Sequence, residues 1–241
     1  MNMRKTLLMI VLGLAVVAIA SAAPLDCAVA ALSAPNVLTG GFSCTLGAVT
    51  FSNFAASGIW NDPNYVADGN SGAGSFTATV QLAPGVSGYA TGFNASTGVA
   101  TLAFQTNFDG FTPLPTGVTS ATSLFRDIQF NYQVTGGVNG IDGWNGGTLS
   151  TNITENVCTT FPCVAGSATV VAQMVIPGQT YVTTPFAMQG TVYVDKDISI
   201  PAGGSLSHLA QSADQTVPEP MTFVLIGSGL LGLGLIRRVR S

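Results

Sequence analysis

Apolar and polar residues alternate along several short stretches of this chain, which is the pattern of half-buried β-strands. The alternation is clearest at residues 75–82 and returns at 128–134, 170–176 and 191–200. A period of two places every second side chain on the same face of a strand, so that one face enters the core and the other meets water. The intervening stretches are dense in Gly, Pro, Asn and Asp, which favour hairpins and loops.

No helical period persists for three turns between residues 41 and 205, and only residues 26–33 are expected to form a short N-terminal helix. Strands at this spacing, without helices between them, predict an all-β fold, and about 180 residues suffice to bury one core. The sequence therefore predicts an antiparallel β-sandwich at residues 23–204, jelly-roll-like rather than immunoglobulin-like because of its length. We expect a loop at the glycine cluster 136–147 and a flexible stalk at 205–216.

Lys196 is the one charged residue that the alternation at 191–200 turns inward. An inward amine needs a partner or a route to water, and the pattern leaves two interpretations open: a strand edge or bulge, or a pair with Asp127. Asp195 and Asp197 fall on the opposite face. We interpret them as outward polar residues of an edge strand rather than as a catalytic pair or a calcium site.

The chain has an even number of cysteines, which predicts two disulfides in an exported protein: Cys27, Cys44, Cys158 and Cys163. Three pairings are open. We expect the first with the second and the third with the fourth, because each bond closes a short local loop, and the first would stabilise by about 3 kcal/mol. No metal site is predicted, because the cysteine spacing is not that of a zinc site and the only histidine, His208, falls in the expected stalk.

Residues 1–22 have the three parts of a secretory signal peptide. A basic start that ends at Lys5 precedes an apolar run at 6–20, and Ala20-Ser21-Ala22 has the small-x-small form of a signal-peptidase site. The sequence therefore predicts export by the general secretion machinery, cleavage by signal peptidase, and a mature chain that begins at Ala23.

Residues 217–241 form a second targeting segment, in which a Pro-Glu-Pro turn and an uncharged run at 221–236 precede three arginines: Arg237, Arg238 and Arg240. Such a run reaches roughly 24 Å as a helix, slightly short of a hydrocarbon core of about 30 Å, so we expect it to span a membrane with local thinning or snorkelling. The arginines belong on the cytoplasmic side, which places the folded domain outside the cytoplasm. The two prolines keep their segment extended and accessible at the outer boundary.

The order of Pro218-Glu219-Pro220, a short membrane segment and an Arg-rich end resembles the PEP-CTERM sorting domain of bacterial exported proteins. The resemblance implies that Pro218, Glu219 and Pro220 are recognised by exosortase, an integral-membrane transpeptidase, and that the protein reaches the cell surface or the extracellular matrix. Residues 41–54, a Gly-x-x-Cys-x-x-Gly stretch that runs into Phe-Ser-Asn-Phe, resemble the opening of some PEP-CTERM ectodomains. The alternative is an ordinary single-pass anchor with an accidental Pro-Glu-Pro.

Between Asp26 and Glu219 the chain is acidic and poor in charge. This region holds 11 acidic residues but only two basic ones, Arg126 and Lys196, which gives a formal charge of −9. Nucleic acids and anionic membrane surfaces both require cationic patches on their partners, so the sequence disfavours both.

A catalytic role is also disfavoured. A Ser-His-Asp triad would depend on His208, a catalytic cysteine would lack an activating histidine, and Glu155 is the only glutamate of the folded region. We therefore predict a non-catalytic exported protein, without a cofactor, that has a structural or display role at the cell surface.

Binding of an extracellular polysaccharide is the alternative function. Trp60, Tyr65, Tyr89 and Trp144 fall in loop-rich stretches, where aromatic rings can stack on sugars. The competing interpretation of Trp60 and Trp144 is that they close the ends of the sandwich core.

Overall fold

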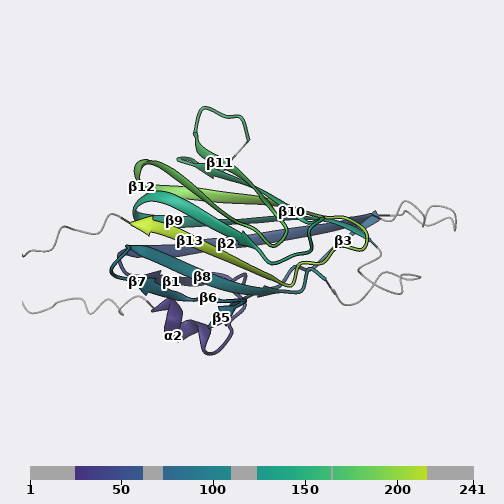
Figure 1. The fold of residues 1–241 in the computed structure, drawn as a ribbon, viewed down its shortest axis with the longest axis horizontal. Coiled ribbons are helices and arrows are strands. Elements are labelled where there is room, and N and C mark those ends of the chain that lie inside the picture. Colours follow the sequence, from purple (N-terminus) through teal and green to yellow (C-terminus); the bar gives the residue numbers. More distant parts are fainter. Residues whose placement is uncertain (1–24, 62–72, 110–123, 164, 216–241) are drawn as a thin grey trace, which may run out of the picture.

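The structure, a computed structural model, describes residues 25–61, 73–109, 124–163 and 165–215. These ranges are mostly antiparallel β-sheet with one short helix, which confirms the predicted all-β class (Figure 1). Within them no helix is long and apolar enough to cross a bilayer. The predicted signal peptide and sorting segment lie outside the described residues.

The elements are α2 (Cys27–Ala31), β1 (Ser43–Leu46), β2 (Val49–Asn61), β3 (Ala73–Phe76), β4 (Val80–Ala83), β5 (Gly85–Val86), β6 (Tyr89–Ala90), β7 (Gly92–Asn94), β8 (Val99–Thr106), β9 (Phe125–Asn145), β10 (Asn152–Cys158), β11 (Val170–Pro177), β12 (Tyr181–Ile200) and β13 (His208–Gln215).

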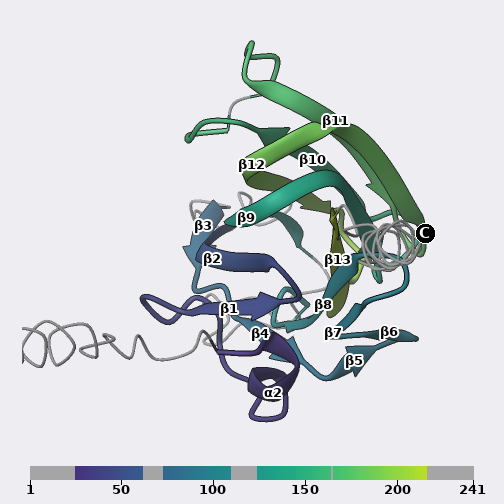
Figure 2. The same cartoon turned by 90° about the vertical axis from the view of Figure 1, so that its left-hand side faces the viewer.

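The long strand β9 is central, and its two halves have different neighbours. Residues 125–135 lie between β2 and the second half of β12, whereas residues 138–145 lie between the first half of β12 and β13. The sheet continues from β13 through β8 to β4, and from β12 through β10 to β11. Figure 2 shows this sheet curling around a common interior, with β2 and β13 on opposite sides. The two layers of the sandwich therefore belong to one continuous sheet.

Most of the glycine cluster at 136–147 lies in β9, which continues to Asn145, so it does not form the loop that we expected. Gly136 and Gly137 have φ values of +128° and +80°, at the point where the partner of β9 changes from β2 to β13. A Cβ at Gly136 would lie 2.1 Å from the carbonyl oxygen of Ala48. Because only glycine tolerates both this conformation and this approach, the cluster acts as a bulge that bends a long strand.

The inward residues of the alternating strands fill the core. Phe51, Phe104 and Phe130 are completely buried, as are the apolar positions that alternate along residues 191–200. The stretch 75–82 differs from the prediction, because it is divided between β3 and β4. Each large apolar side chain that is buried in this way contributes about 1.5–3 kcal/mol.

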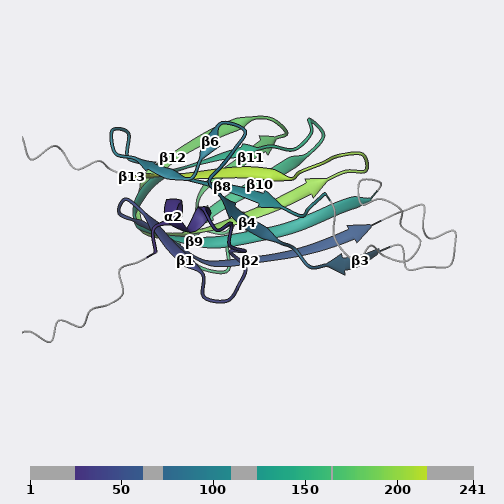
Figure 3. The same ribbon diagram turned by 90° about the horizontal axis from the view of Figure 1, so that it is seen from below.

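The N-terminal part of the domain confirms two predictions. The short helix α2 begins after Asp26, whose carboxylate accepts hydrogen bonds from the amides of Ala28 at 2.7 Å and Val29 at 3.2 Å. Both expected disulfides are present, and the bond between Cys27 and Cys44 joins α2 to β1. Figure 3 shows α2 beside β1 and β4.

The predicted stalk at 205–216 is wrong. Residues 208–215 form β13, which pairs with β8 on one side and with β9 on the other, and residues 209–213 are buried. The folded domain therefore reaches at least residue 215 rather than ending at 204. The strand was hidden in the sequence because polar residues such as Gln211 and Ser212 interrupt its apolar pattern although both are buried.

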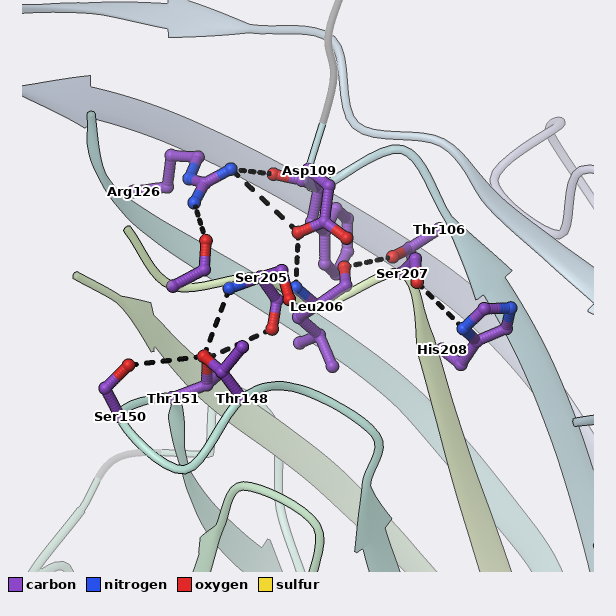
Figure 4. Close-up of polar contacts among 12 residues, drawn as sticks. Thr106, Asp109, Arg126, Thr148, Ser150, Thr151, Ser205, Leu206, Ser207 and His208 are labelled. Atoms are coloured by element: carbon purple, nitrogen blue, oxygen red, sulfur yellow. Dashed lines mark hydrogen bonds and ion pairs between the residues drawn. The ribbon is translucent and has the colours of Figure 1, made fainter. Parts of the chain in front are cut away.

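Arg126 is buried at one end of the core and joins two connections of the chain (Figure 4). Its guanidinium donates hydrogen bonds to the carbonyls of Phe108 at 3.0 Å and Gly204 at 2.7 Å, and it lies 4.0 Å from the carboxylate of Asp109. That carboxylate also accepts a hydrogen bond from the amide of Leu206. The cluster therefore fixes the chain after β8 to the connection between β12 and β13.

Both interpretations of Lys196 are wrong, although the residue does point inward. It lies in the middle of β12, an interior strand, and its partner is Glu155 of β10 rather than Asp127. Asp195 and Asp197 lie on the outer face, and Asp195 accepts hydrogen bonds from the amide of Gln129 at 3.0 and 2.9 Å. Because β12 has neighbours on both sides, these aspartates do not protect a sheet edge.

Candidate functional site

The aromatic residues singled out in the sequence lie in different environments. Trp60 is only 6% exposed, and its ring covers Gly74, where a Cβ would lie 2.6 Å from the indole nitrogen. This residue fills the end of the core and does not offer its ring to a ligand. Tyr65 lies outside the described residues.

Trp144 belongs to a stack of three rings on the outside of the sheet. Tyr89 lies on Trp144 with 5.0 Å between ring centroids, and it also lies on Tyr181 at 5.7 Å. The indole packs inward against Ala83, Val86 and Ala103, while Tyr181 is 44% exposed. Trp144 is therefore the base of an aromatic platform, and the tyrosines form its accessible part.

The strand register places two carboxylates beside this platform. Trp144 lies opposite Tyr181 of β12, and two residues back along β9 Asp142 lies between Thr183 of β12 and Ser212 of β13. After two further residues Gly140 lies opposite Asp214 of β13. Aromatic, polar and acidic side chains thus follow one another across the outer face of three adjacent strands.

An open groove of about 490 Å³ lies over the acidic part of this face, and Asp142 and Asp214 are among the residues that line it. Its walls come from the turn before β8, the second half of β9, the first half of β12 and the end of β13. At Gly140 a Cβ would lie 2.4 Å from a carboxylate oxygen of Asp214, so the glycine leaves the space that this side chain occupies. The lining residues are Thr97, Val99, Asn139, Asp142, Thr183, Pro185, Asp214 and Gln215.

Asp142 is 4% exposed and keeps one carboxylate oxygen without a partner. The hydroxyl of Tyr181 donates a hydrogen bond to its other oxygen at 2.5 Å. Burial, together with the carboxylates of Asp214 and Glu155, raises the pKa of Asp142 to about 6, although the Tyr181 hydroxyl acts in the opposite direction. Burial also raises the pKa of Asp214. The groove is thus a site where carboxylates are held partly dehydrated.

The unpartnered atoms of the groove are hydrogen-bond acceptors. They are one oxygen each of Asn139, Asp142 and Asp214. Buried acceptors without a partner favour a ligand that brings donors, such as hydroxyl groups. The part of the chain that the structure describes holds no cluster of three or more His, Cys, Asp or Glu residues that suits a metal ion.

Among the described residues, the imidazole of His208 makes a polar contact only with Ser207. Its Nδ1 atom lies 2.8 Å from the hydroxyl of Ser207, its neighbour in sequence. Among the described residues no carboxylate contacts the imidazole, so nothing orients the ring as a general base.

Sequence reasoning found Tyr89 and Trp144 but missed Tyr181, Asp142 and Asp214. Asp142 lies in the glycine cluster for which the sequence predicts a loop, and Asp214 lies in the stretch for which it predicts a stalk. The available signal was the acidic residue within each of these two stretches, which only the strand pairing brings together.

Comparison with known proteins adds little to this description. No family model matches the chain, and no curated protein does so. Among solved structures, the carbohydrate-binding module TmCBM61 in complex with β-1,4-galactotriose aligns at 13% identity over 76% of this chain and 94% of its own, with a TM-score of 0.34. A TM-score of this size is not evidence for a shared fold or a shared ligand.

Proposed function

We propose that this chain is an exported, non-catalytic protein that binds an uncharged polysaccharide in the groove between the Tyr89–Trp144–Tyr181 platform and Asp214. One observation carries the proposal: an accessible aromatic platform and dehydrated, unpartnered carboxylate oxygens lie side by side on one face. A sugar ring presents both an apolar C–H face and hydroxyl donors, so its chemistry matches the aromatic platform and the adjacent acidic groove.

The charge of the groove favours an uncharged glycan. Asp142 and Asp214 are acidic, and the only two basic side chains among the described residues, Arg126 and Lys196, are buried and engaged elsewhere. An anionic polysaccharide would therefore meet repulsion without a compensating cation. The same argument disfavours nucleic acid.

Affinity electrophoresis of the purified protein tests this function. Native gels that contain a neutral β-glucan, galactan or xylan should retard the protein, whereas gels with alginate should not. Tyr181→Ala and the double variant Asp142→Asn with Asp214→Asn should each lose the retardation. Tyr193→Ala, a change on the outer face of the other half of β12, is the matched control and should bind as the wild type does.

Three results would contradict the proposal or move it elsewhere. If no neutral glycan retards a correctly folded protein, the binding function is refuted and a structural or display role is favoured. Loss of retardation in Tyr193→Ala but not in Tyr181→Ala would place the ligand at the other half of β12. Release of reducing ends from the polysaccharide would indicate hydrolysis, for which the raised pKa of Asp142 beside Asp214 is the relevant observation.

We also propose that the protein reaches the cell surface or matrix through its PEP-CTERM-like tail. The two disulfides support an oxidising compartment outside the cytoplasm. Mass spectrometry of the C-terminal peptide from membrane and matrix fractions tests the route. A terminus near Pro218 to Pro220 is expected after processing by exosortase, whereas retention of Arg240 and Ser241 in every copy would indicate a plain membrane anchor.

A further inference from the structure

An amine and a carboxyl group are in direct contact inside the sandwich. Lys196 of β12 lies opposite Glu155 of β10, and its Nζ donates a hydrogen bond to Oε2 of Glu155. The two side chains are 1% and 0% exposed. Lys196 is the only lysine after Lys5, and Glu155 and Glu219 are the only glutamates in the chain. Two residue types that this protein otherwise avoids are therefore paired in its core.

The surroundings of the pair are poorly suited to two charges. Three polar atoms near the pair are buried and have no hydrogen-bond partner among the described residues: Oε1 of Glu155, the hydroxyl of Tyr132 and the amide oxygen of Gln211. Burial of an ion pair costs several kcal/mol for each ion, and mutual attraction repays this only when the remaining polar atoms are also satisfied. The arrangement therefore lacks what would make a buried salt bridge favourable.

The same surroundings favour the neutral forms of both groups. Burial raises the pKa of Glu155 and lowers the pKa of Lys196; the attraction between the two acts in the opposite direction on each, and a hydrogen bond from Gln211 also favours the charged form of Glu155, but burial is the larger effect on both groups. A shift of the shared proton to the carboxyl side gives a neutral amine in contact with a neutral carboxylic acid. A neutral amine is a nucleophile, and an un-ionised carboxyl carbon is its electrophile.

We propose that Lys196 and Glu155 join in an intramolecular amide bond. The lone pair of Nζ attacks Cδ of Glu155, the carboxyl hydroxyl leaves with one amine proton, and one water is released. No oxidant, reductant or further reactant takes part. The product contains one N–H and one carbonyl in place of two charges.

The site holds groups that assist this step. Antiparallel pairing fixes the two reactants in contact, which removes the entropic cost of bringing them together. The hydroxyl of Tyr132, whose pKa is raised first by burial and then by the nearby Glu155, stays protonated at neutral pH and is a buried hydrogen-bond donor near the pair. Release of water from an apolar interior favours the amide over hydrolysis.

Peptide mass spectrometry of the protein as isolated from cells tests the bond, because the result does not depend on the mature termini. After reduction, denaturation and chymotrypsin digestion, the peptide with Glu155 should appear joined to the peptide with Lys196, lighter than their sum by one water. Lys196 should also resist trypsin and amine-acylating reagents in the denatured chain, where it is the only ε-amine after Lys5.

A variant at Lys196 tests the chemistry of the proposed bond. Lys196→Arg keeps the positive charge but removes the reactive amine, so the linked peptide should disappear and the denatured chain should migrate more slowly on a gel. Separate peptides of full mass from the wild type, with cleavage after Lys196, would refute the proposal and leave an ion pair. A linked peptide lighter by one ammonia would also refute it, because the acceptor would then be Gln211 rather than Glu155.

Discussion

Replacing Asp142 by Asn should stabilise the protein at neutral pH. Burial raises the pKa of this carboxyl from 3.8 to about 6, so the folded state favours its protonated form. Between about pH 4 and 6 the folded state binds more protons than the unfolded chain, and stability therefore falls as the pH rises through this window. One pKa unit corresponds to about 1.4 kcal/mol, so the ionised carboxylate costs about 3 kcal/mol above the window. The amide of Asn still accepts the hydrogen bond from Tyr181.

Urea unfolding of the wild type and of Asp142→Asn at a series of pH values measures this cost. The free energies of unfolding should agree at about pH 4, and the variant should be more stable by about 3 kcal/mol at about pH 8. The difference between the two proteins is the relevant quantity, because burial also raises the pKa of Glu155 and Asp214 in both. A difference that does not vary with pH would refute the reasoning.

Three further changes test the fold. Replacing both Cys27 and Cys44 by Ser should lower the free energy of unfolding by about 3 kcal/mol, because a link across 17 residues is lost; urea midpoints without reductant measure this. Gly143→Ala should cost about 1–3 kcal/mol in thermal unfolding, because its Cβ would lie 2.3 Å from a core isoleucine, whereas Gly190→Ala, with no atom within 4 Å, should cost far less. Arg126→Met leaves the carbonyls of Phe108 and Gly204 without their donor and removes the positive charge beside Asp109, so it should cost about 3–5 kcal/mol, measured by the same melting experiment.

The strands that could be predicted are those in which apolar and polar residues alternate over consecutive positions. Residues 128–134, 170–176 and 191–200 each alternate in sequence and each lies in a strand with one buried face. The disulfides were also predictable, because short loops limit which cysteines can meet. In both cases the interacting residues are close together in the chain, so the structure can be predicted from a single sequence.

The predictions of a loop and a stalk were wrong because the residue types concerned occur in more than one kind of structure. Glycine ends a strand in many proteins, but at Gly136 it allows β9 to continue past the backbone of Ala48. Small polar residues form linkers in many proteins, but those of β13 lie in a strand that is paired with β8 and β9, and several are buried there. Which use applies depends on the neighbouring strand, and the local sequence does not contain that neighbour.

The groove depends on strand register, which is the part of the fold least visible in sequence. Tyr181 reaches Asp142 across 39 residues because β12 aligns Thr183 with Asp142, and Asp214 joins them because β13 aligns Ser212 with the same residue. A slip of one residue in either strand would turn its apolar residues to water and its polar residues to the core. Since that slip would expose Leu209 and Ala213, which are buried, the apolar core fixes the register and thereby brings the two carboxylates together. The candidate site is therefore a consequence of core packing, although none of its acidic residues belongs to the apolar core.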